Sequence, residues 1–123
     1  MAHRGVEWLI EAHGCDAWRL RDLDAIDALF AAIIRDMSLH PVGTRCWHQF
    51  PMTGGITAIS LLSESHLACH TFPEYGSICL NLFCCRERAE SDFRTLLREY
   101  LGASSVSVRR VERGYEAELA ADA

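Results

Sequence analysis

Hydrophobic residues recur along this chain with two different periods, and each period predicts one kind of secondary structure. Alternation of apolar and polar residues, or a short apolar run between turn residues, is typical of a β-strand. Val6, Trp8 and Ile10 take every second position, which predicts a first strand that ends near the turn at 13–16. Further strands are predicted at residues 45–50, 56–62, 66–72, 77–85 and 105–111.

Apolar residues spaced three and four positions apart predict two amphipathic helices. The first runs onward from Asp22 and carries acidic residues in its first turn. The second covers residues 93–101, where Ser91 is expected to cap the helix and Gly102 to end it. The resulting order is β-α-β-β-β-β-α-β, joined by short turns. It favours an α+β two-layer sandwich, in which a mostly antiparallel sheet carries two helices on one face.

Length and charge exclude several classes of protein. The chain has 123 residues and a mass of 13.8 kDa, which fits a single domain covering residues 1–123. Its formal net charge is −5 and no segment is dense in Arg, so nucleic acid is not an expected partner. No apolar run approaches the roughly 20 residues that cross a bilayer, and the N-terminus lacks the apolar core of a secretory signal. These features predict no membrane partner and a cytoplasmic location.

The basic residues are unusual, because all 12 are Arg and none is Lys. A pyridoxal-phosphate enzyme needs a Lys to hold its cofactor, and a Walker-type loop needs one on the phosphates, so both classes are excluded. Any imine chemistry must take its carbonyl from another source. The six cysteines include no C-x-x-C pair, which argues against a disulfide framework and a zinc ribbon.

Candidate chemistry is densest between Ser63 and Glu74, which hold hydroxyl, carboxylate, imidazole and thiol groups. His66 and His70 share one face of the predicted strand, about 13 Å apart at their Cα atoms, so no metal site is expected. If the strand at 77–85 pairs back on this one, Cys85 comes near Ser65, and a hydroxyl, an imidazole and a thiol converge. Each residue also has an ordinary structural role open to it: a turn Ser, a hydrogen-bonded His or a core Cys. A Cys-His hydrolase is a further alternative, although no orienting residue or oxyanion motif is visible.

The segment Leu62–Gly76, with the sequence LSESHLACHTFPEYG, closely resembles the core of the S-adenosylmethionine decarboxylase proenzyme of the short prokaryotic type. Leu82–Cys85 extends the resemblance, as do the first strand with its Cys-Asp turn, residues 5–16, and the Trp-His-Gln-Phe segment at 47–50. The resemblance implies a proenzyme that cuts itself between Glu64 and Ser65.

In this family the serine hydroxyl attacks the preceding carbonyl to form an ester, and elimination then turns the serine into a pyruvoyl group. The resemblance therefore implies a cofactor made from Ser65 and two fragments, 1–64 and 65–123. His70 matches the processing residue of the family, an imidazole suited to moving the proton that elimination releases. Thr57 stands where relatives carry a serine that assists cleavage. It keeps the hydroxyl but adds a methyl group, which predicts slower processing.

For catalysis, Cys85 matches the acid that returns a proton to the substrate α-carbon after carbon dioxide leaves, and thiols are mostly protonated at pH 7. By the same resemblance, Phe50 stacks on adenine, Glu74 binds the substrate hydroxyls and Glu11 faces the sulfonium charge. The substrate is then S-adenosylmethionine, the enzyme is a pyruvoyl-dependent carboxy-lyase, and the product is the aminopropyl donor for spermidine synthesis. Because two helices leave one sheet face open, we also expect a homodimer of processed chains.

Together with Thr57, two further departures from the family pattern keep other functions open. Asn81 stands where an Asp is common, and Glu7 where a His is common. Both changes fall near the expected substrate pocket. One alternative is a pyruvoyl-dependent ornithine or arginine decarboxylase of the same family. Another is an uncleaved, non-catalytic relative that acts by dimerising with an active partner or by binding a ligand.

Overall fold

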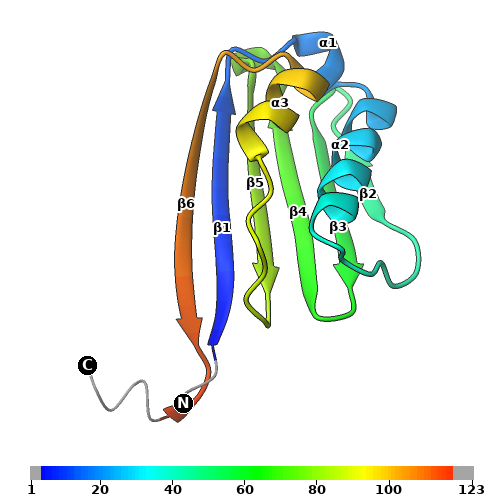
Figure 1. Cartoon of the computed structure of the whole chain (residues 1–123). Coiled ribbons are helices and arrows are strands. Elements are labelled where there is room, and N and C mark those ends of the chain that lie inside the picture. The colour runs from blue at the N-terminus through cyan, green and yellow to red at the C-terminus, as the bar shows by residue number, and fades with distance from the viewer. Residues whose placement is uncertain (1–3, 118–123) are drawn as a thin grey trace.

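The computed structural model describes residues 4–117 and contains one six-stranded sheet with all helices packed on one side of it (Figure 1). The spatial order of the strands is β2-β3-β4-β5-β1-β6, and every pairing is antiparallel. The strands are β1 (Arg4–His13), β2 (Cys46–Gln49), β3 (Ile56–Leu62), β4 (Ser65–Phe72), β5 (Ser77–Cys84) and β6 (Ser105–Gly114). The predicted α+β two-layer sandwich is confirmed.

Three α-helices cover the sheet, one more than predicted: α1 (Ala17–Leu20), α2 (Leu23–Asp36) and α3 (Phe93–Leu101). The helix missed from the sequence, α1, is too short to show a period. Gly102 ends α3 as predicted, in the left-handed conformation with φ of 70°. The predicted cap was wrong, because Asp92 rather than Ser91 accepts the Thr95 N–H at 3.2 Å. Ser91 instead donates to Asp36 at 3.4 Å.

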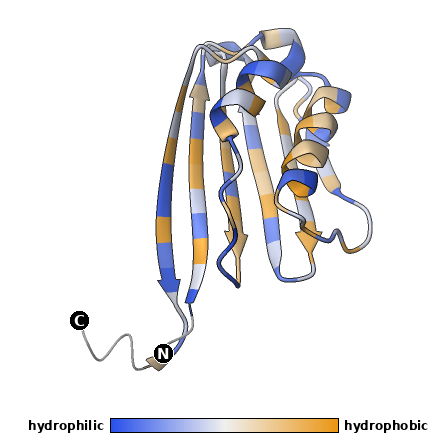
Figure 2. Ribbon diagram, in the orientation of Figure 1, coloured by the Kyte–Doolittle hydropathy of each residue, from blue (hydrophilic) through white to orange (hydrophobic). Residues whose placement is uncertain are grey.

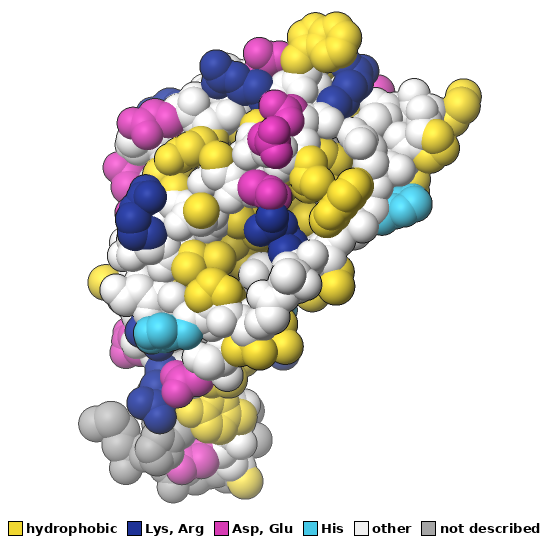
Figure 3. All heavy atoms as spheres, turned by 90° about the vertical axis from the view of Figure 1, so that its right-hand side faces the viewer, with side chains coloured by type: hydrophobic (Ala, Val, Ile, Leu, Met, Phe, Trp, Pro, Cys, Tyr) yellow, Lys and Arg dark blue, Asp and Glu magenta, His cyan; other side chains and the backbone are white. Residues whose placement is uncertain are grey.

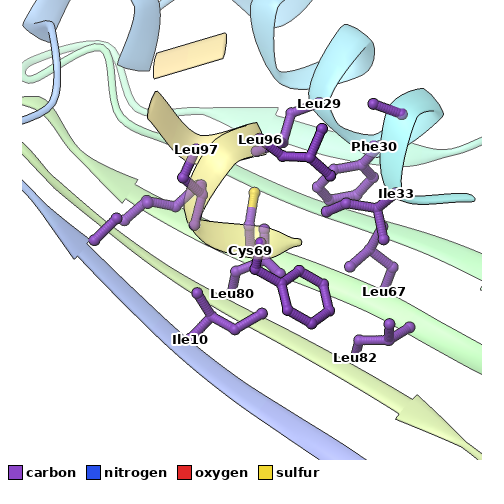
Figure 4. Packing of buried hydrophobic residues seen from close by; sticks show 14 of the residues in the cluster. Ile10, Leu29, Phe30, Ile33, Leu67, Cys69, Leu80, Leu82, Leu96 and Leu97 are labelled. Carbon is purple, nitrogen blue, oxygen red and sulfur yellow. The ribbon is translucent and has the colours of Figure 1, made fainter. Parts of the chain in front are cut away.

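The core lies between the helices and the sheet, because the strand alternation sends every second side chain to that face (Figure 2). Side chains from α2 and α3 meet those from β1, β4 and β5 there (Figure 4). Trp8 is fully buried beside Phe93, and its indole N–H donates to Glu90 at 2.8 Å. A large apolar side chain buried in this way contributes about 2 kcal/mol, so the core stabilises the packing of the helices on the sheet.

The opposite face of the sheet carries no helix within residues 4–117 (Figure 1). Strand register arranges its side chains in rows that run across the strands. Its central rows are Leu61-His66-Phe83-Glu7-Val111, Ile59-Ala68-Asn81-Leu9-Arg109 and Thr57-His70-Cys79-Glu11-Ser107. Large apolar members stay exposed, with Leu61 at 60% and Ile59 at 46%. We refer to this surface as the open face.

Apolar side chains are also exposed at the edge formed by β2, β3 and α2, where they lie among charged ones (Figure 3). Trp47 on β2 and Met52 in the following turn are more than half exposed. Within residues 4–117, no helix combines the length and the apolar character that crossing a bilayer requires.

Candidate functional site

Ser65 is the first residue of β4, directly opposite Cys84 of β5 and Leu62 of β3. This register confirms the predicted pairing of the two strands, which brings the 84–85 pair beside Ser65. Burial raises the pKa of the Cys84 thiol, and a hydrogen bond with Ser65 partly opposes that rise. Cys84 is buried and Cys85 is exposed, so the two neighbours face opposite ways as expected. The Ser65 hydroxyl therefore forms a hydrogen bond with the protonated Cys84 thiol on the core side of the sheet.

The residues just after β5 contact Glu64, whose carbonyl belongs to the peptide bond before Ser65. The Cys85 N–H donates to the Glu64 carbonyl oxygen at 2.8 Å. The Glu64 carboxylate forms ion pairs through its Oε2 atom, with Arg86 Nε at 3.3 Å and with Arg88 Nη2 at 3.8 Å. An N–H aimed at a carbonyl oxygen stabilises negative charge that develops there, so this amide is suited to assist attack on the Glu64 carbonyl.

His70 lies at the other end of β4, in register with Thr57 of β3. The Thr57 Oγ1 and His70 Nδ1 atoms are 3.0 Å apart, which is a hydrogen bond on the open face. His70 lies five residue steps along the strand from Ser65, or about 16 Å between their Cα atoms. The odd spacing also places the two side chains on opposite faces. A straight strand does not bring the Ser65 hydroxyl to the His70 imidazole within one chain, and the convergence of hydroxyl, imidazole and thiol stays a prediction.

Four of the predicted site residues border one cavity of about 380 Å³. Phe50, Thr57, His70 and Glu74 line it, together with Phe72 and residues of the turn after β2. The cavity thus combines an aromatic ring, a carboxylate and the Thr57–His70 pair, a set suited to a ligand with a flat ring and hydroxyl groups. This size is within the range of small-molecule sites.

Glu11 lies outside that cavity. It borders a second hollow of about 290 Å³ on the open face, which is also lined by His70 and by the small side chain of Ala68. Arg109 donates to both carboxylate oxygens of Glu11, at 3.1 Å each. A cation therefore already accompanies this carboxylate. Burial and the neighbouring Glu11 raise the pKa of the Cys79 thiol in the same hollow.

Two of the departures from the family pattern, Asn81 and Glu7, contact each other. The Asn81 amide nitrogen donates to Glu7, and Arg113 donates to the same carboxylate. The Asn81 oxygen is 3.2 Å from His66 Nε2. Since an ionised carboxylate only accepts, the amide oxygen must face His66, and the His66 proton lies on Nε2. His66 also stacks on Phe83 with ring centres 5.7 Å apart. Sequence reasoning missed this network, although both departures were visible.

The described cysteines are all free. Within residues 4–117, no group of three His, Cys, Asp or Glu side chains is placed to hold a metal ion. Sequence reasoning also missed Arg86 and Arg88, whose only signal was two positive charges just after Cys85.

Comparison with known proteins places this arrangement in one family. Residues 6–114 match the model of the S-adenosylmethionine decarboxylase family. The chain is 33% identical over 112 residues to the S-adenosylmethionine decarboxylase proenzyme of Picrophilus torridus, which covers 89% of this chain and 84% of that protein. It is 33% identical over 109 residues to the proenzyme of the same name from Moorella thermoacetica, covering 86% and 84%. A proenzyme of that name from Acidithiobacillus ferrooxidans is 32% identical over 116 residues, covering 93% and 85%. The match takes in the strands, the cavity and the Glu64–Ser65 junction together, and the chain belongs to the S-adenosylmethionine decarboxylase family.

Proposed function

We propose that this chain is a proenzyme that cuts itself between Glu64 and Ser65 and then decarboxylates S-adenosylmethionine to the aminopropyl donor for spermidine synthesis. The observation that carries the proposal is the Glu64 carbonyl, held at 2.8 Å by the Cys85 N–H with the Ser65 hydroxyl on the next residue. Membership of the decarboxylase family supports the same reaction.

Cleavage uses groups that surround the Glu64–Ser65 bond. The Ser65 Oγ attacks the Glu64 carbonyl carbon, and the Cys85 N–H stabilises the negative charge on the carbonyl oxygen. The C–N bond then breaks and the Ser65 nitrogen takes a proton, which leaves an ester. Removal of the Ser65 α-proton breaks the Cβ–Oγ bond, and the electron pair leaves with the Glu64 carboxylate. Water finally replaces the nitrogen at residue 65, releasing ammonia.

The residues present fit a pyruvoyl group made in this way, because the precursor serine begins a strand directly after a turn and the carbonyl before it already has a donor. Such a group supplies the electrophilic carbonyl that a Lys-free chain lacks and withdraws electrons from the substrate α-carbon. Cys85 is exposed at the same end of the sheet, and in this proposal its thiol returns a proton to that carbon.

In this proposal the substrate binds in the cavity lined by Phe50 and Glu74. The half-exposed Phe50 ring offers a surface on which adenine stacks, and the Glu74 carboxylate accepts hydrogen bonds from the ribose hydroxyls. The neighbouring hollow with Glu11 borders the same His70. The predicted contact of Glu11 with the sulfonium would share this carboxylate with Arg109.

The active unit in this proposal is a homodimer. Residue 65 and the cavity that contains His70 lie at opposite ends of β4, so one chain does not hold both parts of the site. Exposed Ile59 and Leu61 on the open face offer apolar area for a second copy. A two-fold axis through such an interface would place residue 65 of one chain near His70 of the partner.

Mass spectrometry of the purified chain tests the proposal directly. We expect fragments 1–64 and 65–123, with a pyruvoyl group at residue 65, and carbon dioxide release from S-adenosylmethionine but not from ornithine or arginine. Ser65→Ala should remain a single chain, whereas Ser63→Ala, a matched serine two residues earlier, should still be cleaved. An uncleaved wild-type chain that is folded, or turnover of ornithine or arginine alone, would contradict the proposal.

A further inference from the structure

Residues 85–88 surround Glu64 with three donors. The Cys85 N–H holds its backbone carbonyl, and the Arg86 and Arg88 guanidiniums both approach the Glu64 Oε2 atom. The Glu64 side chain is 39% exposed, and Arg88 is the more enclosed of the two cations at 28%, compared with 75% for Arg86. Burial raises the pKa of the Cys84 thiol, opposite Ser65, and the nearby positive charge of Arg88 partly opposes that rise.

The charge on Glu64 changes during self-cleavage. Before cleavage the residue has one carboxylate, in its side chain. When the Cβ–Oγ bond of Ser65 breaks, Glu64 gains a second, α-carboxylate as the leaving group, so two like charges arise within one residue. Like charges this close oppose the formation of the second, and nearby cations offset that repulsion. The formation of the ester has no such requirement, because it creates no carboxylate.

We propose that Arg86 and Arg88 are positioning residues for self-cleavage, forming a carboxylate clamp that holds Glu64 and favours departure of its new α-carboxylate. The inference rests on the proposed self-cleavage at this junction. Arg88 contributes more than Arg86, because an enclosed cation is screened less by solvent and salt. The clamp acts on elimination more than on ester formation.

An ordinary surface ion pair would also place Arg beside Glu, but it predicts a different kinetic result. Loss of a merely structural pair would slow both steps or neither. Loss of the clamp slows elimination more than ester formation, so the ester accumulates. The ester has the same mass as the uncut chain but is cleaved by hydroxylamine, which leaves serine, not pyruvoyl, at residue 65.

The experiment follows freshly synthesised full-length chain over time, with samples split between direct mass measurement and hydroxylamine treatment. In Arg88→Met we expect pyruvoyl formation to slow about tenfold while a hydroxylamine-sensitive, full-length species builds up. Arg86→Met should slow it only about twofold to threefold. Arg88→Lys should recover most of the rate, because it keeps the charge. Arg35→Met, which removes an exposed Arg on α2, serves as the matched control.

Each outcome separates the two ideas. A folded wild-type chain that is never cut overturns the proposed function. If the wild-type chain is cut but Arg88→Met and the Arg86→Met/Arg88→Met double variant are cut at the same rate, the clamp is refuted. Slow cleavage without ester, unrescued by Arg88→Lys, also refutes it. Should Arg88→Met fail to fold by circular dichroism, Arg88→Gln and the salt dependence of wild-type elimination provide the test, with elimination expected to slow as salt rises.

Discussion

Combining two uncut variants in one dimer should restore cleavage of one of them if the site is shared between copies. Within one chain, residue 65 and His70 are about 16 Å apart along β4 and face opposite sides, whereas direct proton transfer needs a separation of about 3 Å. We therefore predict that Ser65→Ala and His70→Ala are each uncut alone. In a mixed dimer, the intact Ser65 of the His70→Ala chain meets the intact His70 of its partner.

The magnitude follows from random assortment. With equal expression, half of all dimers are mixed, so about half of the His70→Ala chains should be cut and none of the Ser65→Ala chains. Different affinity tags on the two chains allow mixed dimers to be isolated, and there cleavage of the His70→Ala chain should approach completion. The readout is denaturing electrophoresis followed by mass measurement of residue 65.

The inverse pairing provides the decisive control. A chain that carries both Ser65→Ala and His70→Ala is paired with a wild-type chain, which then has its own Ser65 but a partner without His70. A shared site predicts that the wild-type chain stays uncut. Cleavage there, together with no cleavage in the mixed single variants, would show that His70 acts within its own chain and would refute the two-chain geometry.

Three further predictions concern contacts inside one chain. Thr57→Val removes the 3.0 Å hydrogen bond to His70, worth about 1 kcal/mol, and should slow processing about fivefold in a cleavage time course, whereas Thr57→Ser should process at least as fast as the wild type. Burial raises the pKa of the Cys69 thiol from 9.0 to about 12, so the unfolded chain loses this proton first and the free energy of unfolding should fall as pH rises above about 9. Urea titrations between pH 8 and 11 should show a shallower fall for Cys69→Val, and equal slopes would contradict the assignment. Asn81→Asp brings a second carboxylate against Glu7 and should lower the free energy of unfolding, measured in urea, by about 1 to 2 kcal/mol. Combining it with Glu7→His should recover most of that loss. Purely additive effects of the two substitutions would show that the pair is not coupled.

Local pattern was sufficient for most of the fold. Alternation in β1, the apolar run in β3 and the three-to-four spacing in α2 follow from which side chains must be buried, and burial is a property of each short segment. The cap of α3 was misassigned because Ser91 and Asp92 are both good capping residues, and only the positions of Thr95 and Asp36 decide between them. The four residues of α1 carry too little pattern to be recognised.

By itself, the sequence determined the chemistry available here: a chain with no Lys, a Glu-Ser junction, and a thiol and an imidazole at set spacings from it. Tertiary structure decided which of these groups meet. Strand register put the Cys85 N–H on the Glu64 carbonyl and Thr57 on His70, and the length of β4 kept Ser65 and His70 apart. The physical reason is that side-chain periodicity reports only the direction in which each residue faces, whereas distances between groups depend on how strands far apart in the sequence align.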